Sequence, residues 1–235
     1  MLTVRGLSAG YGHGDVLRGI DADVAPGEIV AVLGRNGSGR STLAKAILGM
    51  LAWRGEVKWR GQGLQGLRTF EIARLGIGYV PETRDVFGGL TVAQNLALGM
   101  QPARSGVSVA SRWRVEDVYQ LFPALHLRRQ VDAAFLSGGE QQMLALGRCL
   151  MGAPAMVVVD EPTEGLAPAL VQQVAHCLDL LRRQGVAVLL MEQKMAIALA
   201  LADRVLVMGH GTIVFGGTAQ QLRDRGDVVR EWLQV

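Results

Sequence analysis

The sequence predicts an α/β fold with a mostly parallel sheet, an antiparallel β edge subdomain and an inserted helical subdomain. Short apolar runs recur along the chain and end at glycine or acidic residues, as buried parallel strands do. Two of these runs, residues 156–160 and 186–191, are joined by a helical pattern, which is a βαβ arrangement. Helical patterns dominate residues 83–150, so we expect a helical subdomain inserted there into a core formed by residues 1–82 and 151–235.

The N-terminal part is predicted to begin with two strands, 2–7 and 16–24, separated by a glycine-rich turn at 10–14. We expect these two strands to form an edge sheet. The apolar run 28–33 ends on glycine and predicts a fully buried strand. A helix is expected at 41–48, ended by Gly49, and a further buried strand at 77–80.

The rest of the chain follows the same patterns. Helices are predicted at 92–100, 115–122, 169–183 and from 137 to about 152, with a loop at 102–111. A hairpin is expected from strands 204–208 and 212–215, which flank the turn at 209–211.

A glycine-rich loop follows the strand at 28–33 and fits the phosphate-binding pattern G-x-x-x-x-G-K-[ST] at every fixed position but one. This phosphate loop consists of Gly34, Arg35, Asn36, Gly37, Ser38, Gly39, Arg40, Ser41 and Thr42. Its glycines leave backbone N–H groups able to bind phosphate oxygens, and the next helix adds its positive dipole end. Ser41 is the expected Mg²⁺ ligand. Arg40 replaces the lysine and keeps its charge with a longer, planar donor group, so hydrolysis of ATP and mere binding both stay open.

The run at 156–160 ends in two carboxylates, Asp160 and Glu161. Ligands gather at the carboxyl ends of parallel strands, so Asp160 is expected to face Mg²⁺ near Ser41 and Glu161 to face the attacking water. A strand capped by a solvated acidic pair is the alternative interpretation.

Residues 136–142, the signature segment, read Leu-Ser-Gly-Gly-Glu-Gln-Gln. Ser137 and Glu140 form a capping box at the start of a helix. Gly138 and Gly139 expose N–H groups at the positive helix end, which makes a second phosphate-binding surface. A well-capped helix without a ligand is the alternative. Two such surfaces in one chain suggest a site shared between two chains.

The phosphate loop, the signature segment and the run 157–162 together resemble the ATP-binding subunit of an ABC transporter, a P-loop NTPase. The resemblance covers nearly the whole chain and implies a head-to-tail dimer of ATPase subunits, equal or different, that binds two ATP molecules with Mg²⁺. It places Tyr11 against adenine, although a turn tyrosine is the alternative. It also places the signature residues at the nucleotide of the opposite subunit: Ser137, Gly138, Gly139 and Glu140.

Three positions depart from the commonest ABC pattern: Glu82 and Glu140 replace glutamines, and Gln193 replaces the switch histidine. These departures resemble the smaller ATPase subunit of branched-chain amino acid importers and their urea and amide relatives. Gln193 can hydrogen-bond the γ-phosphate but cannot be protonated as histidine can. Glu161 is then expected to act as the base, and Glu82 to reach the metal through water.

The resemblance therefore implies an ATPase that drives a separate membrane permease, which imports a small polar solute, in particular branched-chain amino acids, supplied by a solute-binding protein. The alternative is a nucleotide-binding subunit that does not hydrolyse ATP, because Arg40 misplaces the phosphates, and that is paired with a catalytic ATPase subunit. An ABC ATPase of DNA repair or translation is a weaker alternative, since such proteins usually carry long inserts or paired cassettes.

Bulk composition agrees with a single domain of this kind. The chain has 235 residues, 49% of them hydrophobic, which suffices for one core. Its apolar runs are far shorter than the roughly 20 residues of a membrane span, and no secretion signal is seen at the N-terminus. We therefore expect a cytoplasmic protein, peripheral on the inner membrane. Cys149 and Cys177 are expected to be buried, reduced thiols.

The basic residues argue against a nucleic-acid partner. The net charge is only +3, and no lysine or arginine cluster is interleaved with aromatic residues. Arginine supplies 21 of the 24 basic residues, so Arg40 also fits the general bias of the chain toward arginine.

Overall fold

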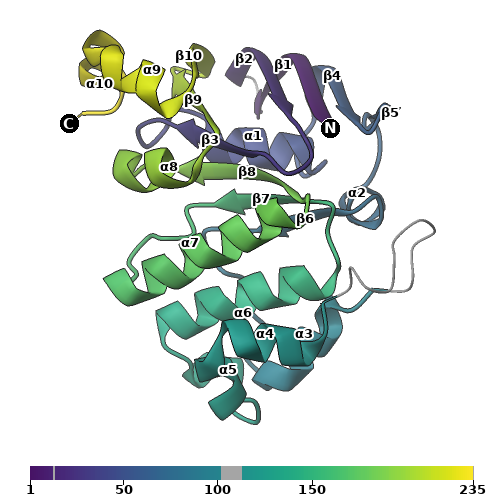
Figure 1. Ribbon diagram of the computed structural model, residues 1–235. Coiled ribbons are helices and arrows are strands. Elements are labelled where there is room, and N and C mark those ends of the chain that lie inside the picture. The colour runs from purple at the N-terminus through teal and green to yellow at the C-terminus, as the bar shows by residue number, and fades with distance from the viewer. Residues whose placement is uncertain (13, 102–112, 235) are drawn as a thin grey trace.

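The computed structural model describes residues 1–12, 14–101 and 113–234, and its strands form two sheets (Figure 1). The strands are β1 (Leu2–Tyr11), β2 (Gly14–Val24), β3 (Ile29–Leu33), β4 (Trp53–Trp59), β5 (Gln62–Gly63), β6 (Ile77–Val80), β7 (Met156–Asp160), β8 (Ala187–Glu192), β9 (Arg204–Gly209) and β10 (Thr212–Gly217). One sheet has the order β2-β1-β4-β5 and is antiparallel; the other has the order β10-β9-β3-β8-β7-β6.

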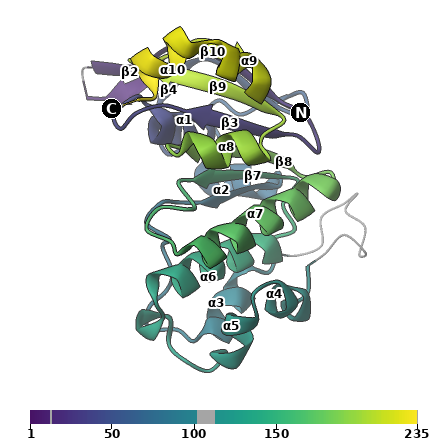
Figure 2. The same ribbon diagram turned by 60° about the vertical axis from the view of Figure 1, so that its left-hand side comes forward.

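The helices cover both faces of the six-stranded sheet and gather at its two ends. They are α1 (Arg40–Ile47), α2 (Thr69–Arg74), α3 (Val92–Gly99), α4 (Val115–Leu121), α5 (Pro123–Leu127), the 3₁₀ helix η2 (Ala133–Phe135), α6 (Gly138–Met151), α7 (Pro168–Arg183), α8 (Met195–Leu201), α9 (Ala219–Asp224) and α10 (Gly226–Trp232). Figure 2 shows α3, α4, α5 and α6 together at one end of the molecule and α9 and α10 at the other.

The six-stranded sheet is parallel except at β10. Strand β3 pairs in parallel with β8 and β9, and β7 pairs in parallel with β6 and β8. Every residue of β3, β7 and β8 is buried, which explains why these strands read as unbroken apolar runs. The prediction of an α/β fold with a mostly parallel sheet and an antiparallel edge subdomain is confirmed.

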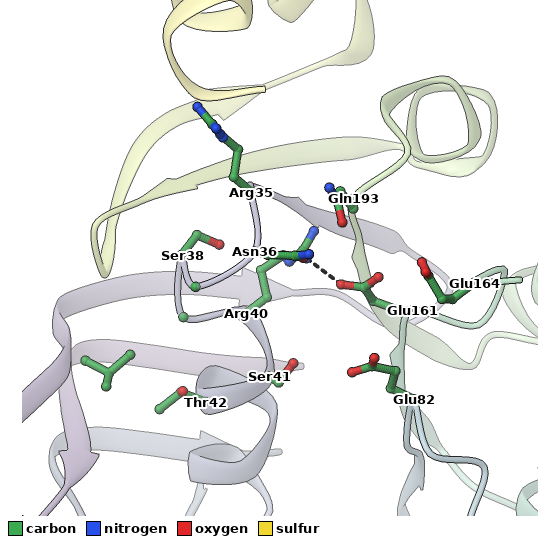
Figure 3. Close-up of a pocket in the computed structure, with 13 residues that line it drawn as sticks. Arg35, Asn36, Ser38, Arg40, Ser41, Thr42, Glu82, Glu161, Glu164 and Gln193 are labelled. Atoms are coloured by element: carbon green, nitrogen blue, oxygen red, sulfur yellow. Dashed lines mark hydrogen bonds and ion pairs between the residues drawn. The ribbon is translucent and has the colours of Figure 1, made fainter. Parts of the chain in front are cut away.

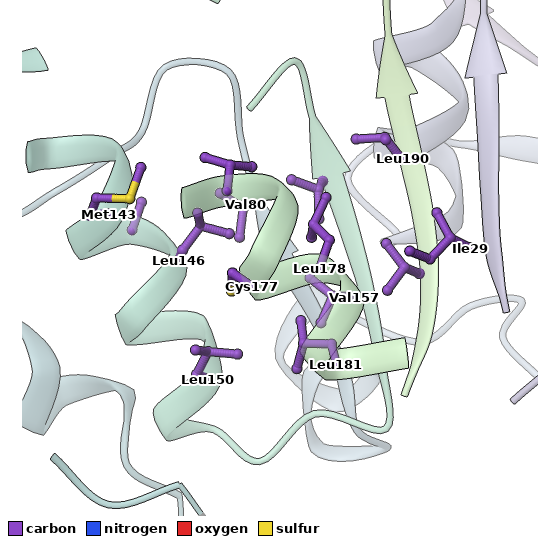
Figure 4. Close-up of a cluster of buried hydrophobic side chains, with 14 of the residues drawn as sticks. Ile29, Val80, Met143, Leu146, Leu150, Val157, Cys177, Leu178, Leu181 and Leu190 are labelled. Atoms are coloured by element: carbon purple, nitrogen blue, oxygen red, sulfur yellow. The ribbon is translucent and has the colours of Figure 1, made fainter. Parts of the chain in front are cut away.

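Alternate residues of the central strands support two separate cores. Ile29 packs in the cluster below the sheet with α6 and α7, whereas Val30 packs in the cluster above it with α1 and the four-stranded sheet. Figure 4 shows the first cluster, in which Leu146 of α6 and Leu178 of α7 face the strands. Because side chains of a strand alternate in direction, the same strands serve both cores, and the positions of their carboxyl ends are fixed from both sides.

The predicted strands all form, within a few residues of the predicted ends, and the predicted helices do so too. The predicted turn at 10–14 is shorter in the structure, because Tyr11 still belongs to β1 and Gly14 already begins β2; His13 lies outside the described residues. A Cβ atom on Gly10 would lie 1.8 Å from the Gly14 carbonyl oxygen, so this tight hairpin requires glycine. The loop predicted at 102–111 lies outside the described residues.

Several short elements were not predicted. Strand β4 pairs antiparallel with β1, on the side away from β2, and buries Val57 and Trp59, while Arg54 and Glu56 are exposed and Lys58 is partly buried. Its alternation was readable in the sequence, but Gly55 in its middle weakens the pattern. The helices α2, α5, α8, α9 and α10 have at most 7 residues each and too few turns for a clear period.

The two cysteines are both free thiols, with Cys177 buried and Cys149 partly buried. Burial raises the pKa of each thiol to about 12, so both are protonated near neutral pH. Within residues 1–12, 14–101 and 113–234, no helix is long and apolar enough to cross a membrane.

Candidate nucleotide-binding site

The phosphate loop connects the carboxyl end of β3 to the amino end of α1 and borders a cavity of about 450 Å³ (Figure 3). Since β3 lies between β8 and β9 in a parallel sheet, the loop sits at the edge where ligands of α/β proteins gather. The cavity is lined by Val16, Arg35, Asn36, Gly37, Ser38, Gly39, Arg40, Ser41, Thr42, Glu82, Glu161, Glu164 and Gln193. The structure thus brings together most of the residues that the sequence assigned to one nucleotide site.

The backbone of the phosphate loop takes a shape that requires glycine. Gly37 and Gly39 have φ angles of 79° and 109°, in the left-handed region. A Cβ on Gly39 would also lie 2.9 Å from a methyl carbon of Leu17, and one on Gly34 would lie 2.5 Å from the Ser38 Oγ. Helix α1 starts at Arg40, with no acidic residue in its first turn. The loop therefore presents backbone N–H groups and a positive helix end to the cavity.

Arg40 folds back over the phosphate loop and reaches across to β7. Its side chain is only 5% exposed. One guanidinium nitrogen, Nη1, donates to the Gly34 carbonyl oxygen at 2.6 Å, and Nη2 donates to Asn36 Oδ1 at 3.3 Å and to Glu161 Oε1. The ion pair with Glu161 is buried on both sides and is drawn as the dashed line in Figure 3. Arg40 thus connects the loop that would hold phosphates to the carboxylate expected to act as the base.

Asp160 is the last residue of β7, directly before Glu161, and is 2% exposed. Burial raises the pKa of its carboxyl group above the ordinary range, and the side chain of Ser41 opposes this rise. Its Oδ1 atom is buried and has no hydrogen-bond partner. A buried carboxylate oxygen without a partner is costly, so this atom is suited to a ligand that supplies positive charge.

Glu161 follows β7 in a left-handed backbone conformation, with a φ angle of 45°. Such a conformation costs about 1–3 kcal/mol in a residue with a side chain and is found mainly at functional sites. The backbone N–H of Glu161 donates to the Met191 carbonyl oxygen at 2.9 Å, which holds the turn against β8. Burial raises the pKa of the Glu161 carboxyl, Arg40 opposes the rise, and Glu192 and Glu82 add to it.

Three further polar side chains reach the cavity from other strand ends. Glu82 follows β6, and in Figure 3 its carboxylate points toward Ser41. Gln193 follows β8 and lies beside Glu161, while Glu164 comes from the contact loop, which we define as residues 161–168. Four strand ends of one sheet therefore supply the site, and the sequence motifs identified each of them.

No sequence motif assigned a role to Glu192, the last residue of β8. Its side chain is buried and hydrogen-bonded to Thr163 of the contact loop at 2.8 Å. The available signal was an acidic residue at the end of an otherwise apolar strand. It was missed because the next residue, Gln193, occupies the position of the switch histidine and was interpreted first.

The signature segment and Tyr11 lie outside the cavity. Ser137 caps α6: its Oγ accepts from the Glu140 N–H at 3.3 Å, and the Glu140 carboxylate accepts from the Ser137 N–H at 2.8 Å. The predicted capping box is therefore confirmed. A Cβ on Gly139 would lie 2.1 Å from a methyl carbon of Leu170, so a larger residue there would require the Leu170 side chain to move. Tyr11 ends β1 with 53% of its surface exposed.

Comparison with known proteins agrees with this geometry. The family model described as ABC transporter matches residues 17–164. The branched-chain amino acid transport ATP-binding protein BraG of Pseudomonas aeruginosa is 42% identical over 224 residues, which cover 94% of each chain. The probable branched-chain amino acid transport ATP-binding protein LivF of Archaeoglobus fulgidus is 35% identical with the same coverage.

The fold of the chain also matches solved structures over nearly its whole length. A structure of an ATP-binding subunit of an ABC transporter has a TM-score of 0.84 and 27% identity, and covers 97% of this chain and 94% of its own. An ATP-binding cassette in its ADP conformation has a TM-score of 0.82 and 26% identity, with 98% and 97% covered. The chain therefore belongs to the ABC transporter family, as an ATP-binding subunit whose ATPase activity is coupled to transport.

Proposed function

We propose that this chain binds MgATP in the cavity above the phosphate loop and hydrolyses it in a head-to-tail dimer, to drive import of branched-chain amino acids through separate permease subunits. The observation that carries the proposal is the position of Glu161, which follows β7 and faces the phosphate loop across the cavity. The named functions of the relatives in Pseudomonas aeruginosa and Archaeoglobus fulgidus support the solute class.

The residues around the cavity fit a magnesium ion. Asp160 has a buried oxygen without a hydrogen-bond partner, and the Ser41 side chain is close enough to lower the pKa of the same carboxyl group. Glu82 also lines the cavity, and its carboxylate points toward Ser41 in Figure 3. Hydroxyl and carboxylate oxygens are the ligands that Mg²⁺ takes, often through water. Ser41 and Asp160 would hold the ion directly and Glu82 through water; when bound, Mg²⁺ neutralises charge on the β- and γ-phosphates.

The protein groups divide the remaining work. Backbone N–H groups of the phosphate loop bind the β- and γ-phosphates, as at other helix amino ends. The Glu161 carboxylate takes a proton from the attacking water, whose oxygen bonds to the γ-phosphorus while the bond to the ADP oxygen breaks. Gln193 donates a hydrogen bond to the γ-phosphate and stays neutral. Arg40 supplies positive charge, but it must exchange the Glu161 carboxylate for phosphate oxygens to do so.

The signature segment, Tyr11 and the helical subdomain lie outside the cavity, and each is proposed to contact a nucleotide or a partner subunit. Ser137, Gly138, Gly139 and Glu140 would contact the γ-phosphate bound by a second ATPase subunit, since they lie outside the cavity of their own chain. Tyr11 would stack on adenine. The helical subdomain at 83–150 would move with the signature segment, and the chain would lie on the cytoplasmic face of the membrane beneath the permease, served indirectly by a solute-binding protein.

A comparison of the unaltered chain with Glu161→Gln tests the proposal. Removing a general base typically costs about 10²- to 10⁴-fold in rate, so phosphate release by the purified protein should fall by about that factor while MgATP binding remains. The control is Glu231→Gln, which changes an exposed glutamate on α10. Equal phosphate release by Glu161→Gln and the unaltered chain would show that this subunit is not catalytic.

A further inference from the structure

One buried carboxylate joins the two loops that carry Glu161 and Gln193. Glu192 is 1% exposed, and both of its oxygens are used. Oε2 accepts from the Thr163 hydroxyl at 2.8 Å, on the contact loop. Oε1 accepts from the backbone N–H groups of Gln193 and Lys194, at 2.9 Å each. Each oxygen of one carboxylate is therefore bound to a different loop.

A second bond joins the same two loops. The ammonium group of Lys194 donates to the Thr163 carbonyl oxygen at 3.1 Å. Thr163 thus donates through its hydroxyl to Glu192 and accepts through its backbone from Lys194, and it is itself 1% exposed. Hydrogen bonds to an ionised, buried carboxylate are among the strong ones, so the spacing between the two loops is fixed.

Packing alone does not call for an acid at this position. The preceding residues of β8 are buried and hydrophobic, and an apolar side chain at 192 would continue the strand. A buried carboxylate is costly unless its oxygens are hydrogen-bonded. Here the cost is offset only when both loops take one particular arrangement, so Glu192 specifies geometry in the way buried polar groups can.

Glu192 does not line the cavity, but its neighbours do. Gln193 and Glu161 both border the cavity, one on each of the joined loops. In Figure 3 the two side chains lie next to each other, on the side of the cavity that faces the phosphate loop. The carboxylate of Glu192 holds the backbone N–H of Gln193 directly, so a shift of Glu192 would move Gln193.

We propose that Glu192 is a positioning residue of the ATPase site: by bridging Thr163 to the backbone of Gln193 and Lys194, it holds the Gln193 side chain where the γ-phosphate arrives. The inference rests on the proposed function and deepens it. The bridge also couples the position of the contact loop to that of Gln193 in the same chain.

The test uses two disrupting variants with matched conservative ones, in the full-length protein. Thr163→Val keeps the shape of the side chain and removes the hydroxyl, and Glu192→Leu keeps the approximate volume and removes both acceptors. Thr163→Ser restores a hydroxyl. Glu192→Gln offers an amide oxygen to the two backbone N–H groups and an amide N–H to the Thr163 hydroxyl, which can also accept.

For each variant, the kcat of ATP hydrolysis and the Kd for MgATP are measured and compared with those of the unaltered chain. Loss of one buried hydrogen bond with its partner left unsatisfied costs about 1–3 kcal/mol, which corresponds to roughly a 5- to 150-fold fall in kcat when the misplacement is felt in the transition state. We expect such a fall in Thr163→Val and Glu192→Leu with the Kd for MgATP changed less than about twofold, because the phosphate loop is untouched. Most of the rate should return in Thr163→Ser and Glu192→Gln.

A double-mutant cycle separates positioning from general stability. If Glu192 acts through Gln193, then Thr163→Val in a Gln193→Ala background should lower kcat by less than about twofold beyond Gln193→Ala alone. Full additivity of the two losses, or an unchanged kcat in folded Thr163→Val, would overturn the proposal.

Hydrogen exchange keeps the inference testable apart from ATP hydrolysis. The Gln193 and Lys194 amides should exchange at least about tenfold faster in Thr163→Val, whereas amides of buried strand β3 should keep their rates. Unchanged exchange at both amides would also overturn the proposal. Failure of the unaltered chain to bind or hydrolyse ATP would instead overturn the proposed function, and the exchange result would still decide whether the bridge exists.

Discussion

The guanidinium of Arg40 and the carboxylate of Glu161 form a buried ion pair that joins the phosphate loop to the end of β7. Arg40 occupies the place of the lysine in the loop pattern, and Glu161 is the expected general base. In the structure these two groups neutralise each other. A γ-phosphate bound at the phosphate loop would compete with Glu161 for the same guanidinium, so nucleotide binding and release of the base would be linked.

The variant Arg40→Lys should raise the turnover of ATP. Lysine provides one compact ammonium group where arginine provides a planar set of five donors that can hold Gly34, Asn36 and Glu161 together. We expect a several-fold higher kcat, since about 1 kcal/mol less ion pairing to break corresponds to roughly fivefold. Phosphate release at saturating MgATP measures the effect. Equal kcat values for the two proteins would show that the arginine is a neutral replacement.

Gly39→Ala should abolish nucleotide binding. The φ angle of 109° and the approach of Leu17 both exclude a methyl group at this position. The loop would have to rearrange, which would turn its N–H groups away from the phosphates. The matched control is Gly89→Ala, where a Cβ meets nothing within 4 Å and φ is not positive. Titration with a fluorescent ATP analogue should show binding in the control and a loss of at least about tenfold in Gly39→Ala. Comparable affinity of the two variants for the ATP analogue would show that the backbone of the phosphate loop does not bind the phosphates.

The sequence identified the parts of the site that follow local rules. The phosphate loop, Asp160, Glu161 and the cap at Ser137 each depend on glycine placement, strand ends or helix caps, which are short-range patterns. The Arg40 ion pair and the Glu192 bridge join residues far apart in the chain, 121 and 29 positions respectively. Such contacts depend on the order of strands in the sheet, and a single sequence does not show which strand ends become neighbours.

The same reasoning explains the missed elements of the fold. Strand β4 is held in place by pairing with β1, more than 40 residues earlier, and Gly55 in its middle lies against the Gly6 carbonyl. Its identity as a strand is therefore decided by β1 and only weakly by its own residues. By contrast, β3, β7 and β8 are buried on both faces, so their apolar composition alone is enough to predict them as strands.

Ser137→Ala should separate nucleotide binding from turnover. The Ser137 hydroxyl caps α6, and replacement of such a cap by alanine costs about 0.5–2 kcal/mol of stability. The residue lies outside the cavity of its own chain, so MgATP binding by the single chain should persist. Turnover should fall, because the proposed contact with the γ-phosphate of the second subunit is lost. The control is Thr218→Ala, which removes a similar cap from α9. An equal fall in turnover with both variants would trace the loss to stability and contradict the proposed contact.

The rate of hydrolysis should fall on acidification at a higher pH than an ordinary glutamate would allow. Burial, together with the charges of Glu192 and Glu82, raises the pKa of Glu161, although Arg40 opposes the rise. The base works in its deprotonated form, so activity is complete above this raised pKa and is lost as the pH drops through it. Measurement of kcat/KM from pH 5 to pH 8, at constant ionic strength, defines this acidic limb, because kcat/KM reports the pKa values of the free enzyme. Removal of the Glu192 charge by Glu192→Gln should move the limb to lower pH, because one of the charges that raise the pKa is gone. A limb that stays in place in Glu192→Gln, with the enzyme folded throughout, would show that a group other than Glu161 controls the rate.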